Sequence, residues 1–132
     1  MPNSQSTGVA YADPEFTTVY ASQEIGYASG AQGAVTQATS KSTGVTLNKS
    51  SGQITMDAAS LAATTNVTFT LTNSALSAKD VLILNVTNGT SGAYNCWVSS
   101  MGAGTATITL RNISGGSLSE AVVLNFAIIH GQ

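Results

Sequence analysis

The residues best suited to catalysis are few in this chain, and they are spread apart. His130 is its one histidine and stands two residues before the end of the sequence. A Ser or Cys nucleophile that is activated by an imidazole base would depend on it. Cys96 is the one cysteine, so no internal disulfide can form, and β periodicity places it in line with Tyr94 and Val98. We interpret Cys96 as a small buried thiol rather than a nucleophile.

The acidic residues give no catalytic or metal-binding pattern. Glycoside hydrolysis needs two carboxyl groups that converge on one bond. The six acids here are spread thinly, and Asp57, Asp80 and Glu120 stand at the ends of predicted strands. No cluster of His, Cys and Asp has the spacing of a metal site. We therefore expect no enzyme activity, no metal ion and no cofactor.

The basic residues argue against a nucleic-acid partner. Lys41, Lys49, Lys79 and Arg111 are scattered, and the formal net charge is −2. No basic stripe is available to neutralise phosphates. No apolar run approaches the ~20 residues of a membrane-spanning helix. The first eight residues have neither the basic nor the apolar region of a signal peptide. We expect no membrane partner and no secretion signal.

Alternating apolar and hydroxyl residues predict the β-strands that position the histidine, cysteine and charged residues named above. Residues 66–72 read Asn-Val-Thr-Phe-Thr-Leu-Thr, and residues 105–110 read Thr-Ala-Thr-Ile-Thr-Leu. A period of two turns the apolar side chains toward a core and the threonines outward. Breakers such as Ser51-Gly52 separate the runs, and residues 56–65 and 73–79 could each form a helical turn. We expect strands at 34–39, 43–48, 53–57, 66–72, 80–87, 94–100, 104–111 and 120–129.

These eight short strands predict a single all-β domain over residues 33–132, a jelly-roll-like sandwich or barrel. Residues 1–32 differ, because their periodicity is weak and they hold both prolines and three of the four tyrosines. We expect an extended N-terminal arm. It is either a disordered tail, although such tails are usually poor in aromatic residues, or a segment that docks on a neighbouring chain. The contact residues in the second case are Tyr11, Phe16, Tyr20 and Tyr27.

Two predicted strands are apolar on both faces. They read Val-Leu-Ile-Leu-Asn-Val from residue 81 and Ala-Val-Val-Leu-Asn-Phe-Ala-Ile-Ile from residue 121. Large exposed apolar patches are rare on monomers, so the second face needs a cover. The cover is either a second sheet of the same domain or another subunit. The subunit-interface residues would then be Val81, Ile83, Val123, Ala127 and Ile129.

The composition favours a module built for contact. Only 8% of the residues are charged, against about 25% in an ordinary soluble domain. An uncharged surface packs against a partner without the cost of stripping water from ions. Trp97 stands on the strand face opposite Tyr94 and offers one ring for stacking on a sugar. We interpret Trp97 as a packing residue.

Three runs resemble segments of small virion proteins of tailed bacteriophages. They are residues 33–49 (GAVTQATSKSTGVTLNK), 51–56 (SGQITM) and 111–126 (RNISGGSLSEAVVLNF). Over residues 33–129 the chain resembles capsid decoration (cement) proteins and the β modules of head and tail fibres. The resemblance implies a jelly-roll-like homotrimer on the exterior of the capsid, made in the host cytoplasm, and it implies no catalytic residue.

From the resemblance and the composition together, we expect a structural virion protein. It would bind the outer surface of a phage capsid as a homotrimer and stabilise it by bridging subunits of the major capsid protein. The alternative is a head-fibre, tail-fibre or receptor-binding module that contacts host-surface glycans, since the same β module is reused on fibres.

Overall fold

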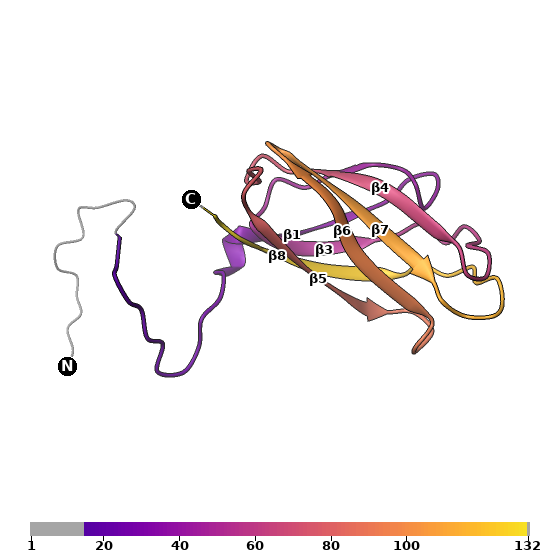
Figure 1. Ribbon diagram of the computed structural model, residues 1–132, viewed down its shortest axis with the longest axis horizontal. Coiled ribbons are helices and arrows are strands. Elements are labelled where there is room, and N and C mark those ends of the chain that lie inside the picture. Colours follow the sequence, from indigo (N-terminus) through magenta and orange to yellow (C-terminus); the bar gives the residue numbers. More distant parts are fainter. Residues whose placement is uncertain (1–14, 132) are drawn as a thin grey trace.

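The chain folds as an all-β sandwich of two four-stranded sheets, which confirms the predicted fold class, and it does not close into a barrel (Figure 1). The computed structural model describes residues 15–131. The helical structure in that range is one 3-10 turn, η1 (Ser29–Ala31), and no helix there is long or apolar enough to span a membrane. The strands are β1 (Gln32–Thr36), β2 (Val45–Thr46), β3 (Ser51–Thr55), β4 (Asn66–Thr72), β5 (Val81–Asn88), β6 (Tyr94–Gly102), β7 (Thr105–Asn112) and β8 (Val123–Ile129).

The chain crosses repeatedly between the two sheets. Sheet A has the strand order β1-β3-β8-β5, and sheet B has the order β2-β4-β7-β6. β1 and β3 are parallel neighbours, as are β2 and β4, and the other pairs are antiparallel. Parallel neighbours need a crossover connection. Here β2 in sheet B supplies the crossover between β1 and β3.

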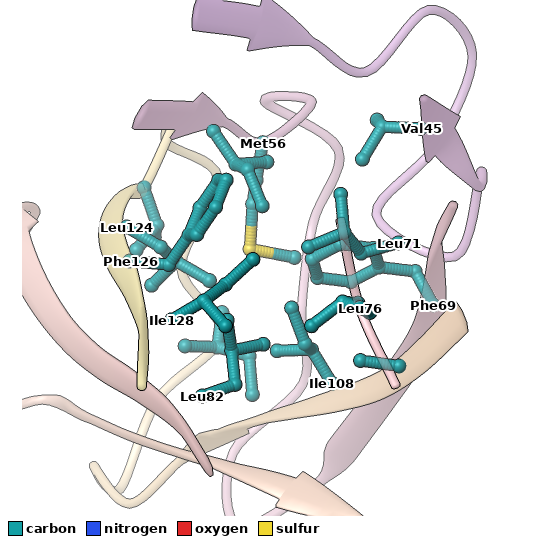
Figure 2. Packing of buried hydrophobic residues seen from close by; sticks show 14 of the residues in the cluster. Val45, Met56, Phe69, Leu71, Leu76, Leu82, Ile108, Leu124, Phe126 and Ile128 are labelled. Carbon is teal, nitrogen blue, oxygen red and sulfur yellow. The ribbon is translucent and has the colours of Figure 1, made fainter. Parts of the chain in front are cut away.

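Side-chain alternation determines where the core lies. On β4, Phe69 and Leu71 are buried, and on β7, Ala106, Ile108 and Leu110 are buried. Figure 2 shows these strands facing Leu82, Leu124, Phe126 and Ile128 of sheet A, with Met56 between the two layers. Fully burying one such aliphatic or aromatic side chain stabilises a fold by about 1.5–3 kcal/mol.

Three local predictions need correction. Residues 56–65 and 73–79 form irregular loops with short turns rather than helix. Asp57 accepts a hydrogen bond from the Ala59 N–H (2.8 Å), and Asn73 accepts one from the Ala75 N–H (3.0 Å). Such local side-chain bonds compete with helix formation. Gly52 lies inside β3, paired with Gly33, and does not break a strand.

The predicted arm spans residues 1–32, of which residues 15–28 have no strand partner and are exposed throughout, whereas residues 29–31 form η1 and Gln32 begins β1. We call residues 15–28 the arm. The arm leaves the sandwich beside the end of β8 and runs away from it (Figure 1). β1 begins at Gln32, directly after η1. The arm is therefore an extended segment attached at one end to a compact sandwich.

Candidate interaction surface

The outer face of sheet A carries exposed apolar side chains at one end. Val81 and Ile83 of β5 are 57% and 49% exposed, and Ile129 of β8 is 56% exposed. The register places Val81 opposite Ile129 and Ile83 opposite Ala127. We call Val81, Ile83, Ala127 and Ile129 the apolar face. Val123 points outward near the other end of β8 and is half-buried.

Sheet B does not cover the apolar face, because it packs on the opposite side of sheet A. Of the two covers considered from the sequence, a second sheet of the same domain is thus the wrong one. Within the described residues this face is open to solvent. Association between subunits stays a prediction.

Sheet A is uncharged. Its four strands contain no Asp, Glu, Lys or Arg. Beyond the apolar face, the Gln53 side-chain amide donates to Asn125 Oδ1 (3.0 Å), and Asn85 stands opposite Asn125. A partner that covers this face therefore does not have to remove water from a charged side chain on any strand of sheet A.

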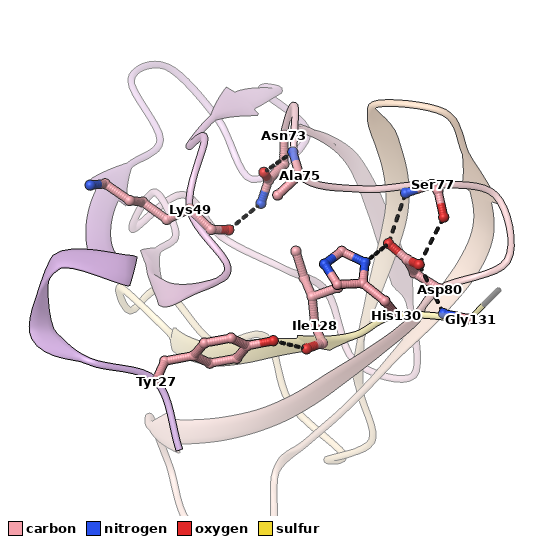
Figure 3. Close-up of polar contacts among 9 residues, drawn as sticks. All are labelled: Tyr27, Lys49, Asn73, Ala75, Ser77, Asp80, Ile128, His130 and Gly131. Atoms are coloured by element: carbon pink, nitrogen blue, oxygen red, sulfur yellow. Dashed lines mark hydrogen bonds and ion pairs between the residues drawn. The ribbon is translucent and has the colours of Figure 1, made fainter. Parts of the chain in front are cut away.

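The base of the arm lies along the apolar face. Ile25, Gly26 and Tyr27 line a shallow groove together with Ile83 and the end of β8, a space of about 450 Å³. The Tyr27 hydroxyl donates to the Ile128 carbonyl (Figure 3). These contacts hold the arm at one side of the groove.

The predicted arm contacts are distributed unevenly. Phe16 and Tyr20 are 69% and 91% exposed, whereas Tyr27 is 38% exposed and is bonded to its own sandwich. Tyr11 lies outside the described residues. Two side chains that the sequence did not single out, Val19 and Ile25, are 63% and 86% exposed. Phe16, Val19, Tyr20 and Ile25 thus offer apolar surface to a partner, while Tyr27 anchors the arm.

The outer face of sheet B is a sheet of hydroxyl groups. Thr68 stands opposite Thr109, and their hydroxyl oxygens are 2.9 Å apart. Ser99 also bonds to Thr109, which is only 4% exposed although it points outward. Trp97 stands opposite Thr109 on β6 and is 38% exposed. Its position opposite to Tyr94 is as predicted, because Tyr94 packs against the core.

Cys96 points inward, as the sequence predicts. It lies between Tyr94 and Val98 on the core side of β6. Burial raises the pKa of its thiol, which lowers the fraction of reactive thiolate at neutral pH.

Ser77, Asp80 and His130 meet where β5 begins and β8 ends, but not in the order of a catalytic triad. The Ser77 hydroxyl donates to Asp80 Oδ1 (2.8 Å), and His130 Nδ1 lies 2.9 Å from Asp80 Oδ2 (Figure 3). In a triad the imidazole stands between the hydroxyl and the carboxylate. Here the carboxylate stands between them, so the cluster fastens the chain end to a turn.

The other acids at strand ends also bind backbone N–H groups. Asp57 bonds to the Ala59 N–H, and Glu120 Oε1 accepts from the Thr90 N–H (2.7 Å). The hydrogen bond from the Thr90 N–H lowers the pKa of Glu120. Among residues 15–131 no three His, Cys, Asp or Glu side chains are close enough to share a metal ion.

Lys41 is a structural residue that the sequence reading missed. The sequence shows it only as one of four scattered cations, but its side chain is 3% exposed. Its ammonium group donates to the carbonyls of Asp57 and Glu120, the second at 2.7 Å. Burial lowers its pKa, and the nearby Asp57 and Glu120 charges oppose that shift. Lys41 thus joins the segments that follow β3 and precede β8.

Comparison of the chain with known protein-family models, with curated proteins and with solved structures gives no match.

Proposed function

We propose that this chain is a structural virion protein that binds the outer surface of a phage capsid as a homotrimer. Its work is mechanical, because it bridges neighbouring major capsid protein subunits and adds association energy to the shell. The observation that carries this proposal is the exposed apolar face on an uncharged sheet, beside an exposed aromatic arm. Both surfaces favour burial against protein.

The resemblance of residues 33–129 to decoration proteins and virion β modules supports the choice of partner. The charge is also consistent with a position outside the shell, since a net charge of −2 gives no attraction to packaged DNA. An interface of ordinary size buries roughly 1,600 Å². Repetition of such contacts around a shell strengthens attachment through avidity.

The test is co-sedimentation of the purified protein with heads of the phage that encodes it. We expect the protein to sediment with the heads and to raise the temperature at which they release DNA. The Phe16→Asp variant should lose most of this binding without unfolding, because Phe16 is 69% exposed. Thr17→Asp, the neighbouring exposed position, is the matched control. Unaltered protein that stays in the supernatant at all concentrations would refute the proposal.

Trp97 favours a second candidate function, a fibre module that binds host-surface glycans. Its ring is 38% exposed on the outer face of sheet B, next to a surface of hydroxyl groups. Such a surface can recognise a sugar by stacking of the aromatic ring combined with hydrogen bonds from the hydroxyl groups. A glycan array probed with the protein tests it, with Trp97→Ala expected to lose binding and Trp97→Phe to retain much of it. No bound glycan on the array would reject this candidate.

A further inference from the structure

The arm exposes more apolar surface than an isolated segment can keep at low cost. Phe16, Val19, Tyr20 and Ile25 are each more than half exposed. The arm leads away from its own sandwich (Figure 1), and residues 15–28 are exposed throughout, so its own sheets do not cover these side chains. Burial of such groups is favourable in proportion to the apolar area removed from water. The described part of the chain therefore provides no surface that covers these apolar side chains of the arm.

The groove on sheet A has the chemistry that such a segment needs. Ile25, Gly26 and Tyr27 occupy one side of it, and the side chains of Ile83 and Ile129 remain about half exposed. The space of about 450 Å³ beside them is lined mainly by aliphatic side chains. A second extended segment can therefore lie next to the one that is present and cover the rest of the apolar face.

The charges of the arm and of the groove are complementary. The first 32 residues contain acids but no Lys or Arg, and Glu24 is exposed next to Ile25. The groove is lined by His130, and Lys79 lies beside the end of β8, where its backbone contacts Gly131. The Asp80 carboxylate next to His130 is buried and already accepts hydrogen bonds. An acidic segment thus meets His130 and no Asp or Glu in the lining of the groove.

We propose that residues 19–24 of one copy lie in the sheet A groove of the next copy, so that the oligomer closes by exchange of arms. This inference rests on the self-association in the proposed function. Each contact joins two different surfaces, the arm and the groove, and three such contacts close a ring. Phe16 stays available for the capsid.

Two full-length variants test the exchange. The arm variant carries Val19→Asp and Tyr20→Asp, positions that are 63% and 91% exposed and so do not support the fold. The groove variant carries Ile83→Asp. Light scattering should find single copies of each variant at a concentration at which the unaltered chain is oligomeric. The controls are Thr18→Asp with Ser22→Asp in the arm, and Asn85→Asp two residues further along β5, and both should stay oligomeric.

Mixing the two variants gives the decisive result. The arm variant keeps an intact groove and the groove variant keeps an intact arm, so the mixture should form complexes with one copy of each. An arm variant that stays oligomeric would refute the exchange of arms and would indicate that the apolar faces of two copies pack on each other. The proposed self-association would then still hold. A mixture that stays fully dissociated would overturn the exchange too. An unaltered chain that is a single copy at every concentration would instead refute the self-association itself.

Circular dichroism checks that each variant is folded. If Ile83→Asp unfolds the sandwich, Ile129→Asp on the same face, at a position 56% exposed, replaces it in both experiments. Loss of head binding by Phe16→Asp with an intact oligomer would concern the capsid contact and not the exchange.

Discussion

The Asp80 carboxylate holds the end of the chain against the turn before β5. It accepts hydrogen bonds from the Ser77 N–H (2.8 Å), the Ser77 hydroxyl (2.8 Å) and the Gly131 N–H (3.1 Å), and it lies against His130. Burial alone would raise its pKa, but the hydrogen bonds from Ser77, Gly131 and His130 outweigh burial. Together they lower the pKa from 3.8 to about 2.

This shift predicts an acid-dependent loss of stability. Because the pKa of folded Asp80 lies below its unfolded value, its stabilising effect is present above about pH 4 and is lost as the pH falls toward 2. We expect Asp80→Asn to lower the free energy of unfolding at neutral pH, with a difference from the unaltered chain that shrinks below pH 4. Urea unfolding between pH 2 and 7 measures it. Glu24→Gln in the arm is the control, and two parallel curves for Asp80→Asn and the unaltered chain would contradict the prediction.

A second prediction at this scale concerns Lys41. Lys41→Met keeps most of the buried side-chain volume but leaves the carbonyls of Asp57 and Glu120 without their donor. A buried polar group left unpaired costs about 1–3 kcal/mol. We expect a loss of about 2 kcal/mol in the free energy of unfolding by urea. Lys79→Met, at an exposed lysine, should change it by less than about 0.5 kcal/mol.

At the scale of the element, prediction from sequence works where the two faces of a strand differ. β4 occupies the predicted residues 66–72, because apolar and hydroxyl side chains alternate there without interruption. The prediction that Gly52 ends a strand is wrong; it rests on the common occurrence of glycine at strand ends. Within β3 it serves a different purpose, since β1, β3 and residue 47 approach one another too closely for a side chain.

The close approach at Gly52 predicts a large effect of a small side chain. A Cβ there would stand 2.7 Å from the Gly33 carbonyl oxygen and 2.7 Å from Leu47 Cδ2. Backbone cannot move aside cheaply, so Gly52→Ala should lower the free energy of unfolding by about 1–3 kcal/mol. Gly116→Ala, where a Cβ meets nothing within 4 Å, is the control and should be nearly neutral. Equal melting temperatures of the two variants would show that β1 and Leu47 yield easily.

At the scale of the whole molecule, the sequence predicts which residues are apolar but not what covers them. The residues of β5 and β8 with two apolar faces are visible in the sequence, whereas the pairing of β8 with both β3 and β5 depends on contacts between distant segments. That pairing leaves Val81, Ile83 and Ile129 in solvent. The burial of Lys41 could not be predicted from the sequence for the same reason, because it depends on contacts with segments that are remote in sequence.

The proposed association links the stability of the sandwich to its concentration. A partner that binds only the folded state stabilises it by mass action, so the melting temperature rises with protein concentration. We expect the melting temperature of the unaltered chain, followed by circular dichroism, to rise by several degrees over about a hundredfold range of concentration. Ile83→Asp should melt at one temperature throughout that range, because it cannot bury the apolar face, and Asn85→Asp on the same strand should behave like the unaltered chain. A melting temperature of the unaltered chain that does not change with concentration would mean that the apolar face stays in water, and another explanation for its exposed isoleucines would then be needed.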